Sequence, residues 1–76
     1  MNISQQYIEG IKEGRTMFEW WKRDGFLTKA FLEENIASIE RLHAKLVPLA
    51  NTKDELPFLK GQLDFLRRQL KEKINA

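Results

Sequence analysis

The residues of this chain that could carry out acid–base or metal chemistry are few. His43 is the only histidine, and the sequence contains no cysteine. A metal site needs three or four converging ligands, so we expect no bound metal. We interpret His43 as a polar residue that sets the register of a helical core. Glu33 and Glu34 form an acidic pair, but the first turn of a helix explains them, because its dipole favours negative charge.

The pattern of hydroxyl groups and glycines does not suggest an enzyme. A catalytic nucleophile needs an activating base at a defined position, and none of the serine, threonine and tyrosine residues has one at a defined spacing. Gly10 and Gly14 lie inside an expected helix, whereas a phosphate-binding loop joins a strand to a helix. We therefore expect no catalytic activity and no cofactor.

Trp20 is the side chain best suited to contact another protein. It projects about 120° from the centre of the apolar stripe of its helix, whereas Trp21 lies on that stripe. Methionine, tryptophan and arginine are among the residue types enriched in protein interfaces, and this helix presents Met17, Trp20 and Arg23. The alternative is that Trp20 lies along a groove beside another helix of the same chain. The sequence alone leaves both interpretations open.

A basic stripe near the C-terminus could also bind a partner. Lys60, Arg67 and Lys71 share one helical face, with Arg68 beside them, and such a stripe could follow the phosphates of a nucleic acid. However, Asp64 lies among these residues, four positions before Arg68, as in an ordinary ion pair on a helix surface. The candidate partner-binding residues are therefore Met17, Trp20, Arg23, Lys60, Arg67, Arg68 and Lys71.

Apolar residues recur at helical spacing in three segments, which predict an all-α fold. The first helix spans 4–24, with Ser4 as its N-cap and Gly25 just after its end. Gly10 and Gly14 lie on its apolar stripe, where each costs about 1 kcal/mol relative to alanine. We expect a neighbouring helix, or a large ring such as Phe58 or Phe65, to approach closely there and offset this cost.

The second helix spans 28–50, with Thr28 as its N-cap, and Pro48 ends or kinks it. The third helix spans 54–74 and begins either at Asp54 or at Thr52. Its apolar residues repeat with the heptad-like spacing of coiled coils, and Phe58 and Phe65 point about 120° away from that seam. The seam consists of Leu56, Leu59, Leu63, Leu66, Leu70 and Ile74.

The 76 residues form a single helical domain, 1–76. We expect the second and third helices to form an antiparallel hairpin, which the first helix or a second copy of the chain completes as a bundle. Three apolar surfaces are more than one such bundle covers, so we expect a homodimer. The net charge of +2 does not by itself indicate a nucleic acid. No apolar run exceeds five residues, so we expect no membrane span and a cytoplasmic location.

Two segments resemble small uncharacterised proteins of temperate bacteriophages and prophages. They are residues 7–15 (YIEGIKEGR) and residues 59–70 (LKGQLDFLRRQL). The resemblance implies no activity; it implies a non-structural accessory protein that acts in the cytoplasm of an infected bacterium. Such proteins commonly bind and modulate a host or defence protein, which is the function we expect. A small basic helical nucleic-acid-binding protein is the alternative.

Overall fold

The computed structural model describes residues 4–49 and 53–74 of the chain. As the sequence predicts, these residues form three α-helices, and the third continues into one turn of π-helix. The elements are α1 (Gln5–Arg23), α2 (Lys29–Leu46), α3 (Glu55–Gln69) and the π-helix η1 (Leu70–Ile74).

The predicted helix starts are confirmed by their capping contacts. The Ser4 hydroxyl accepts a hydrogen bond from the Tyr7 amide at 3.1 Å, and the Thr28 hydroxyl accepts one from the Phe31 amide at 3.0 Å. Each bond satisfies an amide that has no partner within its helix. Asp54 is the N-cap of α3 without a side-chain capping bond; the alternative at Thr52 lies outside the described residues.

The ends of α1 and α2 have different causes. Gly25 follows α1 with a φ angle of +80°, the left-handed conformation that glycine adopts most easily. The prediction that Pro48 ends or kinks the second helix is confirmed: α2 ends at Leu46, four residues before the approximate bound of 50. Pro48 has no amide hydrogen to continue the hydrogen-bond ladder, so the helix stops before it, although Val47 itself keeps helical φ and ψ angles of −50° and −47°.

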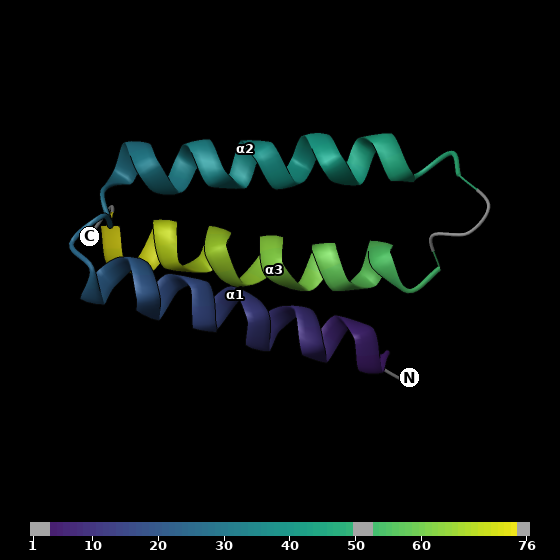
Figure 1. Cartoon of the computed structure of the whole chain (residues 1–76), viewed down its shortest axis with the longest axis horizontal. Helices are drawn as coiled ribbons and strands as arrows, with labels where there is room; N and C mark the ends of the chain where they lie inside the picture. Colours follow the sequence, from purple (N-terminus) through teal and green to yellow (C-terminus); the bar gives the residue numbers. More distant parts are fainter. Residues whose placement is uncertain (1–3, 50–52, 75–76) are drawn as a thin grey trace.

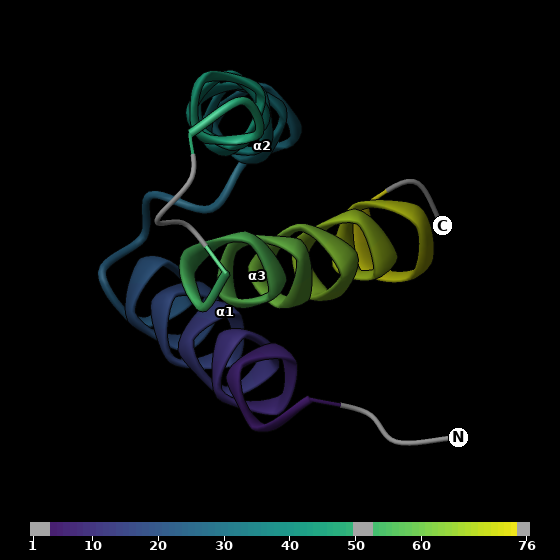
Figure 2. The same ribbon diagram turned by 90° about the vertical axis from the view of Figure 1, so that its right-hand side faces the viewer.

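The three helices pack around α3 as the central element (Figures 1 and 2). α1 and α3 run in the same direction, and α2 runs antiparallel to both. α1 packs along α3, and α2 packs against α3 on another side, but α1 and α2 do not pack along each other. The predicted hairpin of the second and third helices is thus confirmed, and α1 is the helix that completes the bundle.

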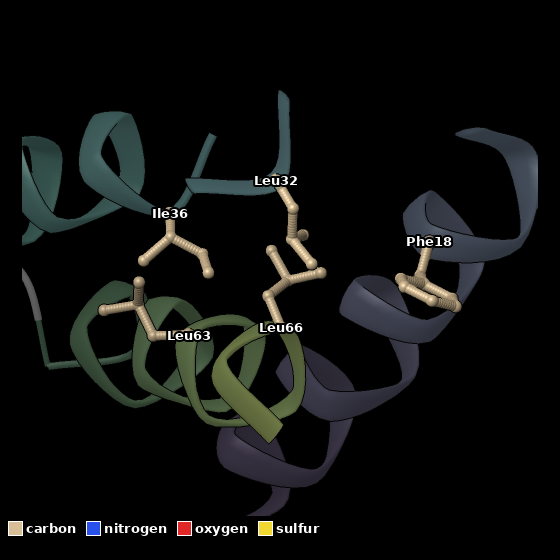
Figure 3. Packing of buried hydrophobic residues seen from close by; sticks show 5 residues of the cluster. All are labelled: Phe18, Leu32, Ile36, Leu63 and Leu66. Atoms are coloured by element: carbon tan, nitrogen blue, oxygen red, sulfur yellow. The ribbon is translucent and has the colours of Figure 1, made fainter. Parts of the chain in front are cut away.

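The core lies mainly between α2 and α3 (Figure 3). Leu32 of α2 and Leu66 of α3 are fully buried and point toward each other, and Ile36 lies opposite Leu63. Phe18 joins this cluster from α1. Leu63 and Leu66 of the leucine seam therefore face α2.

Glycines allow the close contact between α1 and α3. A Cβ atom at Gly10 would lie 2.0 Å from the Phe58 carbonyl oxygen, and one at Gly61 would lie 2.3 Å from the Tyr7 carbonyl oxygen. No side chain fits at either position, so the main chains of the two helices touch. The predicted close approach at the helix-interior glycines is confirmed, and it is made by the backbone of a neighbouring helix.

Candidate partner-binding surface

Trp20 lies on the surface near the C-terminal end of α1. Its side chain is 54% exposed, whereas those of Met17 and Trp21 are partly buried. Arg23 is also exposed, and its guanidinium lies 3.6 Å from the Asp24 carboxylate. We call Met17, Trp20 and Arg23 the Trp20 surface. It presents a large aromatic ring beside an ion pair that water can reach.

A cluster of rings connects α1 to α2 near this surface. Trp21 meets Phe31 edge to face, with ring centroids 5.1 Å apart. Phe26, in the connection between α1 and α2, stacks on Phe31 with ring centroids 6.2 Å apart. Phe26 itself is 59% exposed. Phe26 is not among the residues predicted to bind a partner; its position directly after Gly25, beyond the end of the helix, is the signal that could have indicated an exposed ring.

The basic stripe of α3 is largely occupied by ion pairs. The Lys60 ammonium lies 3.5 Å from the Asp64 carboxylate, and Arg68 lies 3.8 Å from Glu72. Arg67 binds Glu40 of α2 and also lies 3.9 Å from Asp64. Lys71 is exposed. Three of the four predicted basic residues therefore already have a carboxylate partner within the chain.

Asp64 is the centre of a polar network that crosses all three helices. The Tyr7 hydroxyl of α1 donates a hydrogen bond of 2.6 Å to the Asp64 carboxylate, and Arg67 connects that carboxylate to Glu40 of α2. The hydrogen bond to Asp64 and, to a lesser extent, burial raise the pKa of Tyr7 above its ordinary value. The sequence analysis missed Tyr7, since a contact across 57 positions leaves no local pattern.

The predicted binding residues do not form one site. Tyr7 and Trp20 lie about 140° apart around α1, because each residue turns the helix by about 100°. Tyr7 faces the basic stripe through Asp64, so Trp20 points away from that stripe. The Trp20 surface and the residues Lys60, Arg67, Arg68 and Lys71 are therefore two separate surfaces of the molecule.

The described residues show no metal site and no membrane-spanning helix. Across 4–49 and 53–74, no three histidine or acidic residues converge as metal ligands. His43 is partly buried. Over the same part of the chain, no helix combines the length and the apolar character needed to cross a membrane. Comparison of the chain with family models, curated proteins and solved structures gives no match.

Proposed function

We propose that this chain is a non-enzymatic binding protein that modulates another protein through the Trp20 surface. The observation that carries this proposal is the 54% exposure of Trp20. Burying a tryptophan ring contributes more free energy than burying most other side chains, and residues of this type dominate the energetics of protein interfaces. The resemblance to phage accessory proteins supports a host or defence protein as the partner.

Capture from a bacterial lysate tests the role of Trp20. We expect the wild-type chain to retain a specific protein that Trp20→Ala no longer retains. Ile8→Ala is the matched control, because Ile8 is a partly exposed apolar residue on another side of α1. A protein that both variants retain as well as the wild type does would contradict the proposal. Circular dichroism checks that both variants keep their helices.

Nucleic acid is the alternative partner, and the ion pairs of α3 speak against it. Phosphate binding releases counterions in proportion to the cations that are free to meet phosphates, and Lys60, Arg67 and Arg68 already meet carboxylates. We expect a random DNA duplex to bind only weakly at 50 mM salt. Tight binding that falls steeply with added salt would overturn the protein-binding proposal.

We also propose that the chain forms a homodimer. The sequence-based argument used Phe58 and Phe65 as an uncovered face, but in the structure this side of α3 packs against α1. The support now comes from α2, which packs along α3 alone and keeps Leu42 46% exposed and Val47 55% exposed. A second copy that pairs through the Leu42 side of α2 would cover Leu42, whereas Val47 lies about 140° around the helix from it.

A further inference from the structure

A groove runs along the outer side of the α1–α3 pair. It consists of two hollows, of about 350 and 550 Å³, and Phe65 lines both of them. Figure 2 shows that α1 and α3 diverge toward their C-terminal ends, where the larger hollow lies. We define the outer groove by the lining residues Ile11, Arg15, Phe18, Lys22, Leu27 and Phe65.

The residues of α1 that line the outer groove share one helical face. Ile11, Arg15, Phe18 and Lys22 follow one another at intervals of four, three and four positions, the spacing of neighbours on a helix surface. Apolar and basic residues alternate along this row. Phe18 also contacts Phe65 of α3 edge to face, with ring centroids 6.1 Å apart. The groove therefore has an apolar floor with cations at its rim.

The charges around the groove do not cancel. Its two hollows are lined by four basic residues and two acidic ones, Glu19 and Asp64. The Asp64 carboxylate already accepts the Tyr7 hydroxyl and lies near Lys60 and Arg67. In contrast, Arg15 and Lys22 form no ion pair with any other described residue. Their two positive charges remain available to a ligand.

We propose that the outer groove binds an acidic peptide segment of a partner protein. Apolar side chains of that segment pack on the partly exposed Leu27 and Phe65, and its carboxylates pair with Arg15 and Lys22. Arg–carboxylate pairs at the rim of an apolar contact add specificity and speed association. This inference rests on the proposed protein-binding function and adds a chemical class of partner and a second contact surface.

The length of the groove fits a short peptide. The residues of α1 that line its two hollows extend from Tyr7, in the smaller hollow, to Lys22, in the larger one. This corresponds to about 22 Å at 1.5 Å per residue. About four turns of helix or about seven residues of extended chain cover that distance. A nucleic acid bound through its phosphates would gain little from the apolar floor, so a peptide uses both features of the groove.

Selection from a library of displayed random twelve-residue peptides tests the proposal. We expect the enriched peptides to combine aspartate or glutamate with leucine or an aromatic residue. Fluorescein-labelled copies of these peptides are the probes for fluorescence anisotropy. The double variant Arg15→Glu, Lys22→Glu should weaken their binding about tenfold or more, because attraction becomes repulsion at two contacts.

A matched double variant controls for the change in net charge. Lys45→Glu with Lys53→Glu reverses the same number of charges at residues that do not line the groove, and it should change the affinity less than about twofold. If Arg15→Glu, Lys22→Glu fails to fold by circular dichroism, Arg15→Gln with Lys22→Gln replaces it. Three results overturn the proposal: no enriched peptide, enriched peptides without acidic residues, or equal effects of the two double variants.

The Trp20→Ala variant separates this inference from the proposed function. Peptide binding that depends on Trp20 but not on Arg15 and Lys22 would overturn the groove while leaving the Trp20 surface intact. If peptide binding depends on Arg15 and Lys22, and Trp20→Ala still captures the same protein from the lysate, the outer groove is supported and the role of the Trp20 surface is contradicted. A DNA duplex that displaces the peptide at low micromolar concentration would show a phosphate site and would also overturn the proposal.

Discussion

At the scale of single residues, the Tyr7 hydroxyl is the polar group that joins α1 to α3. Its hydrogen bond to the Asp64 carboxylate is 2.6 Å long and partly buried. A hydrogen bond to a charged group contributes about 1.5–3 kcal/mol, and solvent near the bond reduces this value. We expect Tyr7→Phe to lower the free energy of unfolding by about 1 kcal/mol. Urea denaturation followed by circular dichroism measures the change.

The same bond makes stability depend on alkaline pH. The Asp64 hydrogen bond, burial and the Asp64 charge raise the pKa of Tyr7 above the ordinary value of 10.0, while Arg68 acts in the opposite direction. The folded state therefore holds the phenol proton more tightly than the unfolded state. This contribution is fully present below pH 10 and is lost as the pH rises through the folded-state pKa.

Tyr7→Phe has no phenol proton at position 7, so it is the control for the pH dependence of the wild type. The stability difference between wild type and Tyr7→Phe should be constant up to about pH 9 and shrink above pH 10. Urea midpoints of both proteins between pH 8 and 11 give this difference. A difference that stays constant to pH 11 would show that Tyr7 titrates as in the unfolded chain.

At the scale of elements, the distance between α1 and α3 is set by glycines. Alanine at a helix-interior position normally stabilises by about 1 kcal/mol relative to glycine. At Gly10, however, the new Cβ would lie 2.0 Å from the Phe58 carbonyl oxygen, an overlap with main chain that no side-chain rotation relieves. Overpacking costs about 1–3 kcal/mol, so we expect Gly10→Ala to be destabilising overall.

Gly14→Ala is the matched control for this prediction. Its Cβ would lie 3.3 Å from the Gln62 backbone and from Phe65 Cβ, a tight contact that a small shift can accommodate. We expect its thermal midpoint to lie well above that of Gly10→Ala. Equal midpoints for the two variants would mean that α1 and α3 do not touch at Gly10.

The leucine seam of α3 gives a second prediction at this scale. Leu63 is 3% exposed and packs within the cluster shared with α2. Truncation of a buried leucine to alanine costs about 2–5 kcal/mol, since it removes apolar contacts and leaves a cavity. A domain of this size has little stability in excess of that amount. We therefore expect Leu63→Ala to be largely unfolded at 25 °C, while Leu42→Ala, at a 46% exposed position, remains folded.

Local patterns in the sequence were sufficient to predict the helices and their starting residues. Ser4 and Thr28 are capping residues whose effect depends on amides only three positions away. The periodicity of α3 likewise identified two apolar faces. It could not identify what covers Phe58 and Phe65, because an apolar face is equally well buried by another helix or by a second chain. The structure shows that α1 packs against this face and leaves both rings partly exposed.

The candidate site was less predictable than the fold. The sequence placed Trp20 off the apolar stripe but left open whether it lies in a groove beside another helix; the structure shows it 54% exposed. The pairing of Arg67 with Glu40 and of Tyr7 with Asp64 joins residues 27 and 57 positions apart. Such contacts depend on how the helices cross, which short-range spacing does not specify. The same limit applies to Arg15 and Lys22, which the divergence of α1 and α3 places at one groove.

At the scale of the whole molecule, α2 is the helix with the least packing. It contacts α3 along its length and meets α1 through the rings at Trp21 and Phe31.

Pairing of two chains through α2 is the prediction that belongs to this scale. Leu42 lies on a flank of α2, about 80° around the helix from the buried Leu32 and about 120° from the buried Ile36, and keeps about half of its surface in solvent. A two-fold contact brings the same side chains of both copies together and removes them from water.

Sedimentation equilibrium from about 1 to 100 μM should show a mass rising from 9.0 kDa toward about 18 kDa. Leu42→Glu should hold the mass at 9.0 kDa, because it places a charge in the apolar contact. Ile8→Glu on α1 should leave the dimer intact, and a wild-type mass of 9.0 kDa throughout would make the exposed side of α2 a surface for a different protein.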